Sequence, residues 1–258
     1  MSLAIDLSGR KALVTGVSMG IGLSIAELLA CAGCDVAGCA LESVDSEEVQ
    51  KFIHLVESQG QRAHYHQIDL SDPSAPGQWP PMVAEQLGGV DILVSNAGRS
   101  IFSGVEPCSE ETWQECVNLN LAAHWRVAQA AKPFLERGTD PVIIAIASIH
   151  AYTTVSGSFP YNVAKAGVVA MIQSLALEWG PRIRAVGIAP GYIQVRPIPP
   201  ERLDHPSQLH PVGRIGQPEN IGSLCAFLAS PWSSFTSSST ILVDGGRVAL
   251  MEDKVFSV

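Results

Sequence analysis

The amino-acid sequence predicts an α/β protein built on a doubly wound parallel sheet of about seven strands, with helices on both faces and therefore three layers. Short apolar runs alternate with segments of helical periodicity from one end of the chain to the other. A glycine-rich turn also joins the first apolar run to the first helical segment. At 258 residues, 47% of them hydrophobic, the chain can bury one sizeable core. We therefore expect a single domain over residues 1–258.

Each expected strand is a short apolar run, and each expected helix repeats its apolar residues every three or four positions. In chain order, the expected strands are Lys11–Thr15, Val36–Ala40, Ala63–Ile68, Asp91–Ser95, Val142–Ala147, Arg184–Ile188 and Thr240–Val243. The expected helices between them are Ile21–Ala32, Glu47–Ser58, Met82–Leu87, about Ser109–Glu136, Pro160–Trp179 and Pro218–Ala229. The first of these helices stops at Gly33, a residue that commonly ends helices. Right-handed crossovers between such strands place ligands beyond the carboxyl ends of the sheet.

Two proline-rich stretches interrupt this alternation. Asp72–Pro81 is interpreted as an irregular entry to a helix, without an assigned function. Tyr192–Pro211 follows the sixth expected strand and leaves from the ligand-bearing edge. Because loops longer than about 12–15 residues are commonly functional or disordered, we expect a substrate loop at about 192–211.

Charge and cysteine content exclude several classes of partner. Sixteen basic residues against twenty-five acidic ones give a net charge of −9 without any basic run, so we expect no nucleic-acid or membrane partner. The N-terminus shows no secretory signal, and no apolar run approaches the roughly 18 residues that span a bilayer. The six cysteines are not arranged as a disulfide framework, and Cys31-x-x-Cys34 lacks a second Cys/His pair at metal-binding spacing, so this pair is interpreted as small buried thiols. We expect a cytoplasmic protein without a metal, acting on a small molecule.

The glycine-rich turn reads Thr15-Gly16-Val17-Ser18-Met19-Gly20-Ile21-Gly22. Glycines let the backbone approach a pyrophosphate, which rests on the N-terminal N–H groups of the following helix. Such a triplet can also be no more than a tight strand–helix turn. Its place between the first strand and the first helix favours a dinucleotide site.

Further short motifs follow at the ends of the expected strands and helices. They are Asn96-Ala97-Gly98, Asn120, Ser148, Tyr161-x-x-x-Lys165, Pro190-Gly191 and Asp244-Gly245-Gly246. Together with the glycine turn, they resemble the short-chain dehydrogenase/reductase family in its Thr-Gly-x-x-x-Gly-x-Gly branch. The resemblance implies a Rossmann-type fold, a homotetramer or homodimer, and NAD(P)-dependent interconversion of a secondary alcohol and a carbonyl. The cofactor-binding residues that it implies are Gly16, Ser18, Met19, Gly20, Ile21, Gly22, Asp69, Leu70, Asn96, Ala97, Gly98, Tyr161, Lys165, Pro190, Gly191 and Ile193.

Tyr161 and Lys165 are four residues apart on an expected helix, so their side chains share one face. A tyrosine titrates near pH 10, and a nearby ammonium together with an oxidised nicotinamide favours its phenolate. Tyr161 can then exchange a proton with the substrate oxygen, to which Ser148 can donate a hydrogen bond. Tyr-x-x-x-Lys alone is common on helix surfaces, but the spacing of Ser148 and Asn120 matches the family.

By resemblance, Asn120 supports a water-linked proton path to Lys165, which also holds the ribose hydroxyls. Asn118 competes for this role. Asn120 is chosen because the residues after it, from Leu121 to Ala123, align with the pattern that follows the family's asparagine.

The cofactor type is predicted from the end of the second strand. NAD-binding relatives carry an acid there and many NADP-binding relatives carry a base before the second glycine, whereas this chain has Ala40 and Met19. Between Lys11 and Lys51 there is no basic residue, and Glu42, Asp45, Glu47 and Glu48 crowd the region. A 2′-phosphate would meet negative charge here, so NAD is favoured over NADP.

The candidate substrate residues are Ser148, Tyr161, His150, Arg99 and Arg196. His150 is equally well read as a substrate contact or as a packed spacer. Arginine forks suit carboxylates, which favours a sugar, a sugar acid or a hydroxyacid, although solvated surface arginines would look the same. Val195 departs from the family, which has a threonine there to bond the nicotinamide amide.

Two alternatives to a dehydrogenase remain at this point. A catalytically silent nucleotide-binding regulatory protein would have the same fold, but Tyr161, Lys165 and Ser148 are all present. Epimerases or dehydratases of this fold usually have a different glycine spacing and a longer substrate domain. A fold supports many functions, so the site must decide.

Overall fold

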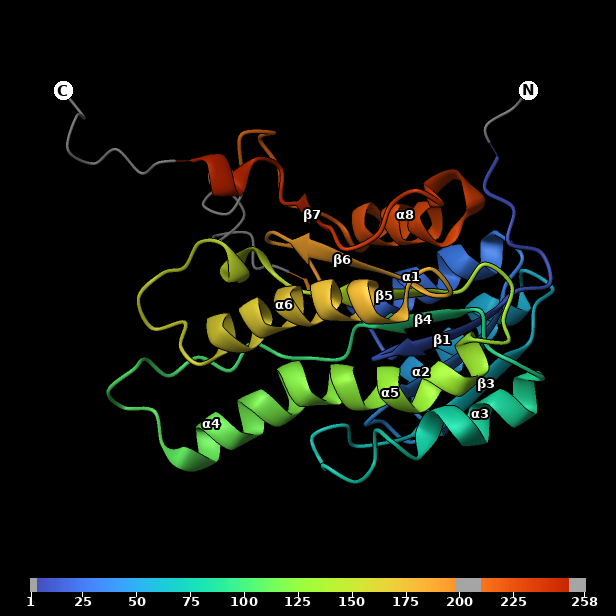
Figure 1. Ribbon diagram of the computed structural model, residues 1–258. Coiled ribbons are helices and arrows are strands. Elements are labelled where there is room, and N and C mark those ends of the chain that lie inside the picture. The colour runs from blue at the N-terminus through green and yellow to red at the C-terminus, as the bar shows by residue number, and fades with distance from the viewer. Residues whose placement is uncertain (1–3, 198–209, 251–258) are drawn as a thin grey trace.

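The computed structural model describes residues 4–197 and 210–250 of the chain, which form one seven-stranded parallel sheet between layers of helices (Figure 1). The strand order is β3-β2-β1-β4-β5-β6-β7. The strands are β1 (Lys11–Thr15), β2 (Asp35–Ala40), β3 (Ala63–Gln67), β4 (Ile92–Ser95), β5 (Val142–Ile146), β6 (Arg184–Pro190) and β7 (Thr240–Val243). All six pairings are parallel, which confirms the predicted Rossmann-type, doubly wound fold class.

Helices cover both faces of the sheet. They are α1 (Gly20–Cys31), α2 (Glu47–Glu57), α3 (Trp79–Leu87), α4 (Glu110–Val117), α5 (Ala123–Leu135), α6 (Tyr161–Trp179) and α8 (Pro218–Ala229). One buried cluster joins the sheet to α1, α2 and α8, and a second joins it to α3, α5 and α6. Adjacent residues of β1 show the division, since Val14 belongs to the first cluster and Leu13 to the second. Strands buried on both faces explain the nearly continuous apolar runs of the sequence.

The helix starts show why these segments are helical. Ser46 caps α2 by accepting a hydrogen bond from the Val49 amide at 3.3 Å, and two glutamates follow in the first turn, where the helix dipole favours negative charge. Helix α3 begins at Trp79, three residues before the predicted Met82, because prolines are tolerated in the first turn of a helix. Helix α1 differs from α2, since its N-cap residue Met19 makes no side-chain capping bond.

The long helix predicted over Ser109–Glu136 is interrupted. Between α4 and α5, the residues Asn118–Ala122 form a π-helical turn. Such turns occur often at functional sites, and apolar periodicity does not reveal one in advance. The interruption determines where Asn120 lies.

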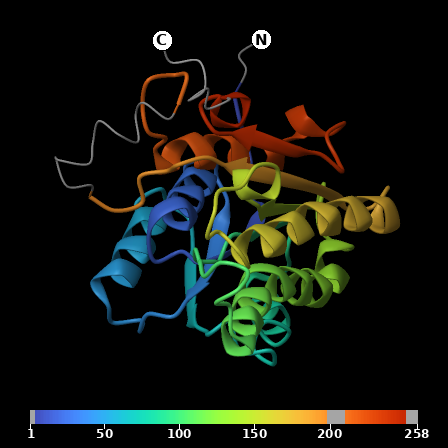
Figure 2. The ribbon, with the colours of Figure 1, turned by 90° about the vertical axis from the view of Figure 1, so that its left-hand side faces the viewer.

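The sheet places its ligand-bearing edge at the carboxyl ends of the strands. The order reverses between β1 and β4, so the turns that follow these two strands adjoin each other at the switch point. Figure 2 views the molecule from the side toward which the strand arrows of Figure 1 point. Of the predicted substrate loop, residues 192–197 and 210–211 are described, and its middle part lies outside the described residues. No helix within the described parts of the chain combines the length and apolarity that a membrane crossing requires.

Candidate active site

The glycine turn after β1 depends on the absence of side chains. Gly16 and Gly20 have left-handed φ angles of +75° and +56°. A Cβ atom on Gly22 would lie 2.0 Å from the carbonyl oxygen of Gly16. All three glycines are therefore required by the backbone path itself.

The N-terminus of α1 is open toward this turn. Met19 precedes the helix in an extended conformation, and its side chain makes no capping bond to the first-turn amides of Gly20, Ile21 and Gly22. Free amides at the positive end of the helix dipole suit a pyrophosphate. The residues present thus fit a dinucleotide cofactor, which was the interpretation of the sequence.

A hydrogen-bonded link joins the turn to the end of β4. The Thr15 hydroxyl oxygen accepts bonds from the backbone amides of Asn96 and Ala97 at 2.8 and 2.9 Å. In return, the Asn96 side-chain amide donates to the Thr15 carbonyl oxygen at 2.9 Å. Asn96-Ala97-Gly98 is therefore fixed against the glycine turn at the switch point, where a dinucleotide passes in this fold.

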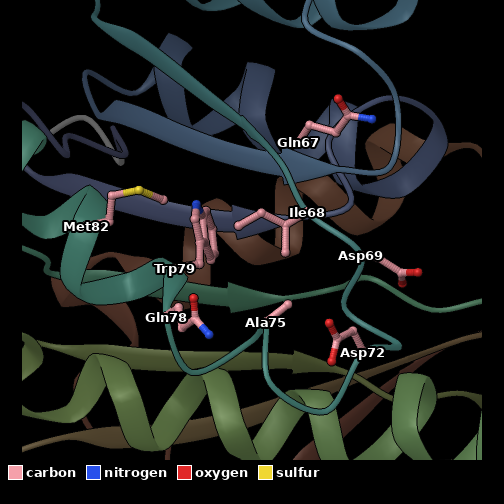
Figure 3. A pocket seen from close by; sticks show the side chains of 8 residues that line it. All are labelled: Gln67, Ile68, Asp69, Asp72, Ala75, Gln78, Trp79 and Met82. Carbon is pink, nitrogen blue, oxygen red and sulfur yellow. The ribbon is translucent and has the colours of Figure 1, made fainter.

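Two of the predicted cofactor-binding residues, Asp69 and Leu70, follow β3. Asp69 lines a hollow of about 310 Å³, and Leu70 beside it is buried. Figure 3 shows Ile68, Asp69 and Asp72 on the turn after β3, with Trp79 and Met82 across the hollow on α3. The Asp69 carboxylate accepts bonds from the Ser71 amide and hydroxyl at 2.8 and 2.6 Å, which orders this turn.

The other end of the predicted cofactor site follows β6. Pro190 ends β6, and the Gly191 amide donates to Val243 of β7 at 2.9 Å. A Cβ on Gly20 would lie 2.9 Å from the Val195 side chain, so the start of the substrate loop reaches the glycine turn. Ile193 belongs to the same segment and bridges to Gly216.

Tyr161 is the first residue of α6 and is half-buried at the carboxyl edge of the sheet. Burial raises the pKa of its phenol, while hydrogen bonds from Ser148 and Ser100 act to lower this pKa. Ser148 is the second residue after β5, and its hydroxyl oxygen accepts a bond from the His150 amide at 3.2 Å. Its hydroxyl hydrogen is thus available to an oxygen atom beside Tyr161.

Lys165 lies one turn farther along α6 and is 3% exposed. Its Nζ atom donates to the Ile146 carbonyl oxygen at 2.9 Å and lies 5.8 Å from the centre of the Tyr161 ring. Burial lowers the pKa of Lys165 to about 8. The sequence predicted that this ammonium, together with an oxidised nicotinamide, would favour the phenolate. Burial is the largest cause acting on the pKa of the Tyr161 phenol, and it raises this pKa.

Asn120 is completely buried, and its Oδ1 atom accepts the Arg99 amide at 3.1 Å. A Cβ atom on Gly98 would lie 2.7 Å from this oxygen and 3.4 Å from Lys165 Nζ. The side chains of Asn120 and Lys165 therefore both lie close to Gly98. The competing Asn118 instead accepts a bond from Arg126 at 3.3 Å. The structure therefore brings Asn120, rather than Asn118, to Lys165.

The other candidate substrate residues, His150, Arg99 and Arg196, make different kinds of contact. His150 lies edge-on to Tyr161, with ring centres 5.9 Å apart, and burial lowers the pKa of its imidazole. The Arg99 guanidinium forms an ion pair with Glu115, and the Arg196 guanidinium lies 3.8 Å from the Met19 sulfur. Of these three, His150 is the one whose side chain directly contacts Tyr161.

The sequence interpretation missed Phe102. Its ring lies edge-on to both Tyr161 and His150, at 5.5 and 5.6 Å between ring centres, and half of its surface is exposed. An isolated backbone bridge to Pro160 holds it beside the start of α6. An aromatic residue four positions after Asn96-Ala97-Gly98 was the available signal, but only the fold brings it to Tyr161.

Comparison with known proteins agrees with this geometry. A family profile described as enoyl-(acyl carrier protein) reductase matches residues 16–247. The chain is 36% identical to a 2-dehydro-3-deoxy-D-gluconate 5-dehydrogenase of Bacillus subtilis over 250 residues, which are 94% of this chain and 96% of that protein. It is 33% identical to 3beta-hydroxysteroid dehydrogenase 1 of Eggerthella lenta over 249 residues, 93% and 94% of the two chains.

The fold is also close to that of a solved relative. A 7-alpha-hydroxysteroid dehydrogenase complexed with NADH and 7-oxo glycochenodeoxycholic acid superposes with a TM-score of 0.86 at 28% identity, covering 94% of this chain and 95% of that one. These relatives are all named as dehydrogenases, and their names give different classes of substrate.

Proposed function

Because the chain belongs to the short-chain dehydrogenase/reductase family, we propose that it interconverts a secondary alcohol and a ketone with Tyr161, Ser148, Lys165 and Asn120 as its catalytic group. Membership makes the protein an NAD(P)-dependent oxidoreductase that acts on CH–OH groups of small molecules. The assignment of residues, of NAD and of the substrate class is our proposal. It treats residues 1–258 as one catalytic domain with a substrate loop at about 192–211.

One observation carries the residue assignment. Ser148, just after β5, acts to lower the pKa of the Tyr161 phenol, and Lys165 Nζ lies 5.8 Å from the centre of the same ring at the carboxyl edge of the sheet. A substrate oxygen that meets both hydroxyl groups would lie where a proton donor, a proton acceptor and a positive charge converge.

The residues then have separate tasks. Ser148 donates a hydrogen bond to the substrate oxygen, and Tyr161 takes the hydroxyl proton during oxidation or returns it during reduction. The Lys165 ammonium stabilises the phenolate, since its pKa of about 8 keeps it mostly charged at neutral pH. A nicotinamide cofactor, when bound, would provide the hydride chemistry at the substrate carbon.

NAD as the preferred cofactor is supported by the surroundings of β2. Ala40 ends the strand, Leu41 follows it with 57% of its surface exposed, and the Glu42 carbonyl is fixed by the Tyr65 hydroxyl at 2.5 Å. The nearby side chains that carry charge are acidic, which disfavours a 2′-phosphate.

For the substrate, we propose the secondary alcohol of a sugar, a sugar acid or a hydroxyacid. The Bacillus subtilis relative, named for a sugar acid, supports this class. The ion pair between Arg99 and Glu115 argues against Arg99 as a carboxylate ligand and leaves Arg196 as the stronger candidate.

A hydroxysteroid is the second candidate, because one specific observation favours it. Phe102 presents an exposed apolar ring beside His150 and Tyr161, as a flat apolar substrate would require. The Eggerthella lenta relative is named for such an activity.

The proposal also includes a cytoplasmic homotetramer or homodimer. All six cysteines are unpaired thiols, which suits a reducing compartment. The prediction of a buried thiol is wrong for Cys31, which is exposed, whereas Cys34 is buried. Trp125 on α5 and Leu177 on α6 expose apolar surface, which favours assembly.

Replacing Tyr161 with Phe tests the proposed function. We expect kcat to fall by about 10²–10⁴-fold, measured as NADH formation on a panel of sugar acids, polyols, hydroxyacids and hydroxysteroids, with NADH affinity retained by fluorescence titration. Tyr152→Phe, which removes an exposed phenol nearby, is the matched control. Full turnover in Tyr161→Phe would overturn the mechanism. If the wild-type enzyme binds NADH but turns over nothing, a silent nucleotide-binding protein becomes the better interpretation.

A further inference from the structure

Cys116 is a buried thiol that the proposed reaction leaves without a role. It lies in the last turn of α4, is 0% exposed, and precedes Asn120 by four residues. The side-chain amide of Asn120 donates a hydrogen bond to its sulfur, with 3.6 Å between Nδ2 and Sγ. The thiol is therefore in direct contact with one of the four proposed catalytic side chains.

The Asn120 amide is held at both of its ends. Its Nδ2 atom donates to Cys116, and its Oδ1 atom accepts the Arg99 amide at 3.1 Å on the side of Gly98 and Lys165. A rotation of the amide by half a turn would set its N–H groups against the Arg99 N–H and lose that bond. The Arg99 amide thus selects the orientation of the Asn120 amide, and the contact with Cys116 holds its other end in place.

The hydrogen bond from Asn120 to Cys116 matters because the backbone around Asn120 is not a regular α-helix. Asn120 is the central residue of the π-helical turn Asn118–Ala122, so the regular α-helical bonding pattern does not fix it. Cys116 belongs to the preceding regular helix α4 and provides a rigid point of attachment. Burial raises the pKa of its thiol, so Cys116 stays neutral and places no negative charge beside Lys165.

We propose that Cys116 is a positioning residue, whose sulfur holds the Asn120 amide oxygen toward Gly98 and Lys165 and so keeps the proton path of Tyr161 in order. This inference rests on the proposed function. It assigns no covalent or redox step to the thiol, which acts only as a hydrogen-bond acceptor.

Cys116→Val tests the inference, because it keeps a buried apolar side chain of similar size and removes the acceptor. We expect kcat to fall about fivefold, the effect of one lost neutral hydrogen bond, with NADH affinity unchanged. We also expect the apparent pKa in the pH profile of kcat to rise, because the group that relays the proton is less well held. Cys116→Ser, which restores an acceptor, should recover most of kcat and the wild-type pH profile.

The matched control is Cys225→Val in α8, which makes the same change at another fully buried cysteine, on the opposite face of the sheet. Thermal unfolding of each variant separates a folding defect from a defect in the site. If Cys116→Val does not fold, Cys116→Ala takes its place in the comparison with Cys116→Ser.

The outcomes are distinct. Wild-type kcat and pH profile in Cys116→Val would overturn the inference, and so would equal loss in the Val and Ser variants, which would indicate packing alone. Loss of turnover in Tyr161→Phe together with an unaffected Cys116→Val would reject the Cys116 role and keep the proposed function. Retained turnover in Tyr161→Phe would reject the proposed function itself.

Discussion

The Nζ atom of Lys165 donates a 2.9 Å hydrogen bond to the carbonyl oxygen of Ile146, at the end of β5, from a position that is 3% exposed. A single carbonyl is a weak partner for a buried ammonium, and burial accordingly lowers the pKa of Lys165 from 10.5 to about 8. Keeping this buried ammonium charged beside the phenol of Tyr161 therefore costs the folded protein free energy.

Lys165→Met should reveal that cost as a pH-dependent stability. Between pH 8 and 10.5 the unfolded chain keeps the proton that folded Lys165 releases, so rising pH favours the folded state. Relative to Lys165→Met, the wild-type free energy of unfolding should increase by about 3 kcal/mol across this window and stay level below it. Urea denaturation at a series of pH values measures the difference. Lys51→Met, which replaces an exposed lysine of α2, is the control. If its free energy of unfolding had the same pH dependence as that of Lys165→Met, the lowered pKa would not belong to Lys165.

Gly22→Ala should disrupt the predicted pyrophosphate site. The added Cβ would meet the Gly16 carbonyl oxygen at 2.0 Å, so the turn must shift away from its present path. We expect NADH affinity to fall at least tenfold and stability to fall by roughly 1–3 kcal/mol. Fluorescence titration and thermal unfolding check both effects. Gly77→Ala is the control, because a Cβ there meets nothing within 4 Å. Equal NADH affinity in the two variants would exclude this turn as the cofactor site.

Leu41→Arg should increase the preference of the enzyme for NADP over NAD. The residue follows β2 and is 57% exposed, so an arginine there can reach a 2′-phosphate without displacing the core. We expect the wild-type enzyme to have the higher kcat/KM with NAD, and the variant to shift the NADP-to-NAD ratio of kcat/KM by at least tenfold. Gln59→Arg adds the same charge at an exposed site beyond the end of α2 and should leave the ratio unchanged. A wild-type preference for NADP would refute the cofactor proposal.

Phe102→Ala should weaken substrate binding more than chemistry. The ring borders Tyr161 and His150 with half its surface exposed, where it can pack on the substrate but exchanges no proton. We expect the substrate KM to rise about five- to tenfold, with kcat within threefold of wild type and the NADH affinity unchanged. The loss should be greater for a steroid than for a sugar acid if an apolar face is what the ring contacts. Phe235→Ala removes a fully exposed aromatic ring and is the comparison; an unchanged KM in Phe102→Ala would remove Phe102 from the site.

Local patterns account for what could be predicted. The strand and helix alternation, the turn from Gly16 to Gly22, and the shared face of Tyr161 and Lys165 all depend on residues that are near one another in the chain. The fold class follows from the same patterns, because parallel strands with right-handed crossovers leave few topologies.

Contacts between distant segments could not be predicted in this way. His124 is buried, with its Nδ1 atom 2.7 Å from the Ser95 hydroxyl on β4. Arg99 was a candidate carboxylate ligand, yet its guanidinium is paired with Glu115 of α4. Neither contact can be predicted from the residues that neighbour His124 or Arg99 in the sequence.

The sequence by itself determined the sheet, the glycine turn and the order of the polar motifs, since each is encoded by spacing within a few residues. Only the tertiary structure decided that a π-helical turn carries Asn120 to Gly98, that Cys116 holds its amide, and that Phe102 closes on Tyr161. The physical reason is burial: desolvation sets the pKa of Tyr161 and Lys165, and it exists only after segments far apart in the chain have packed together.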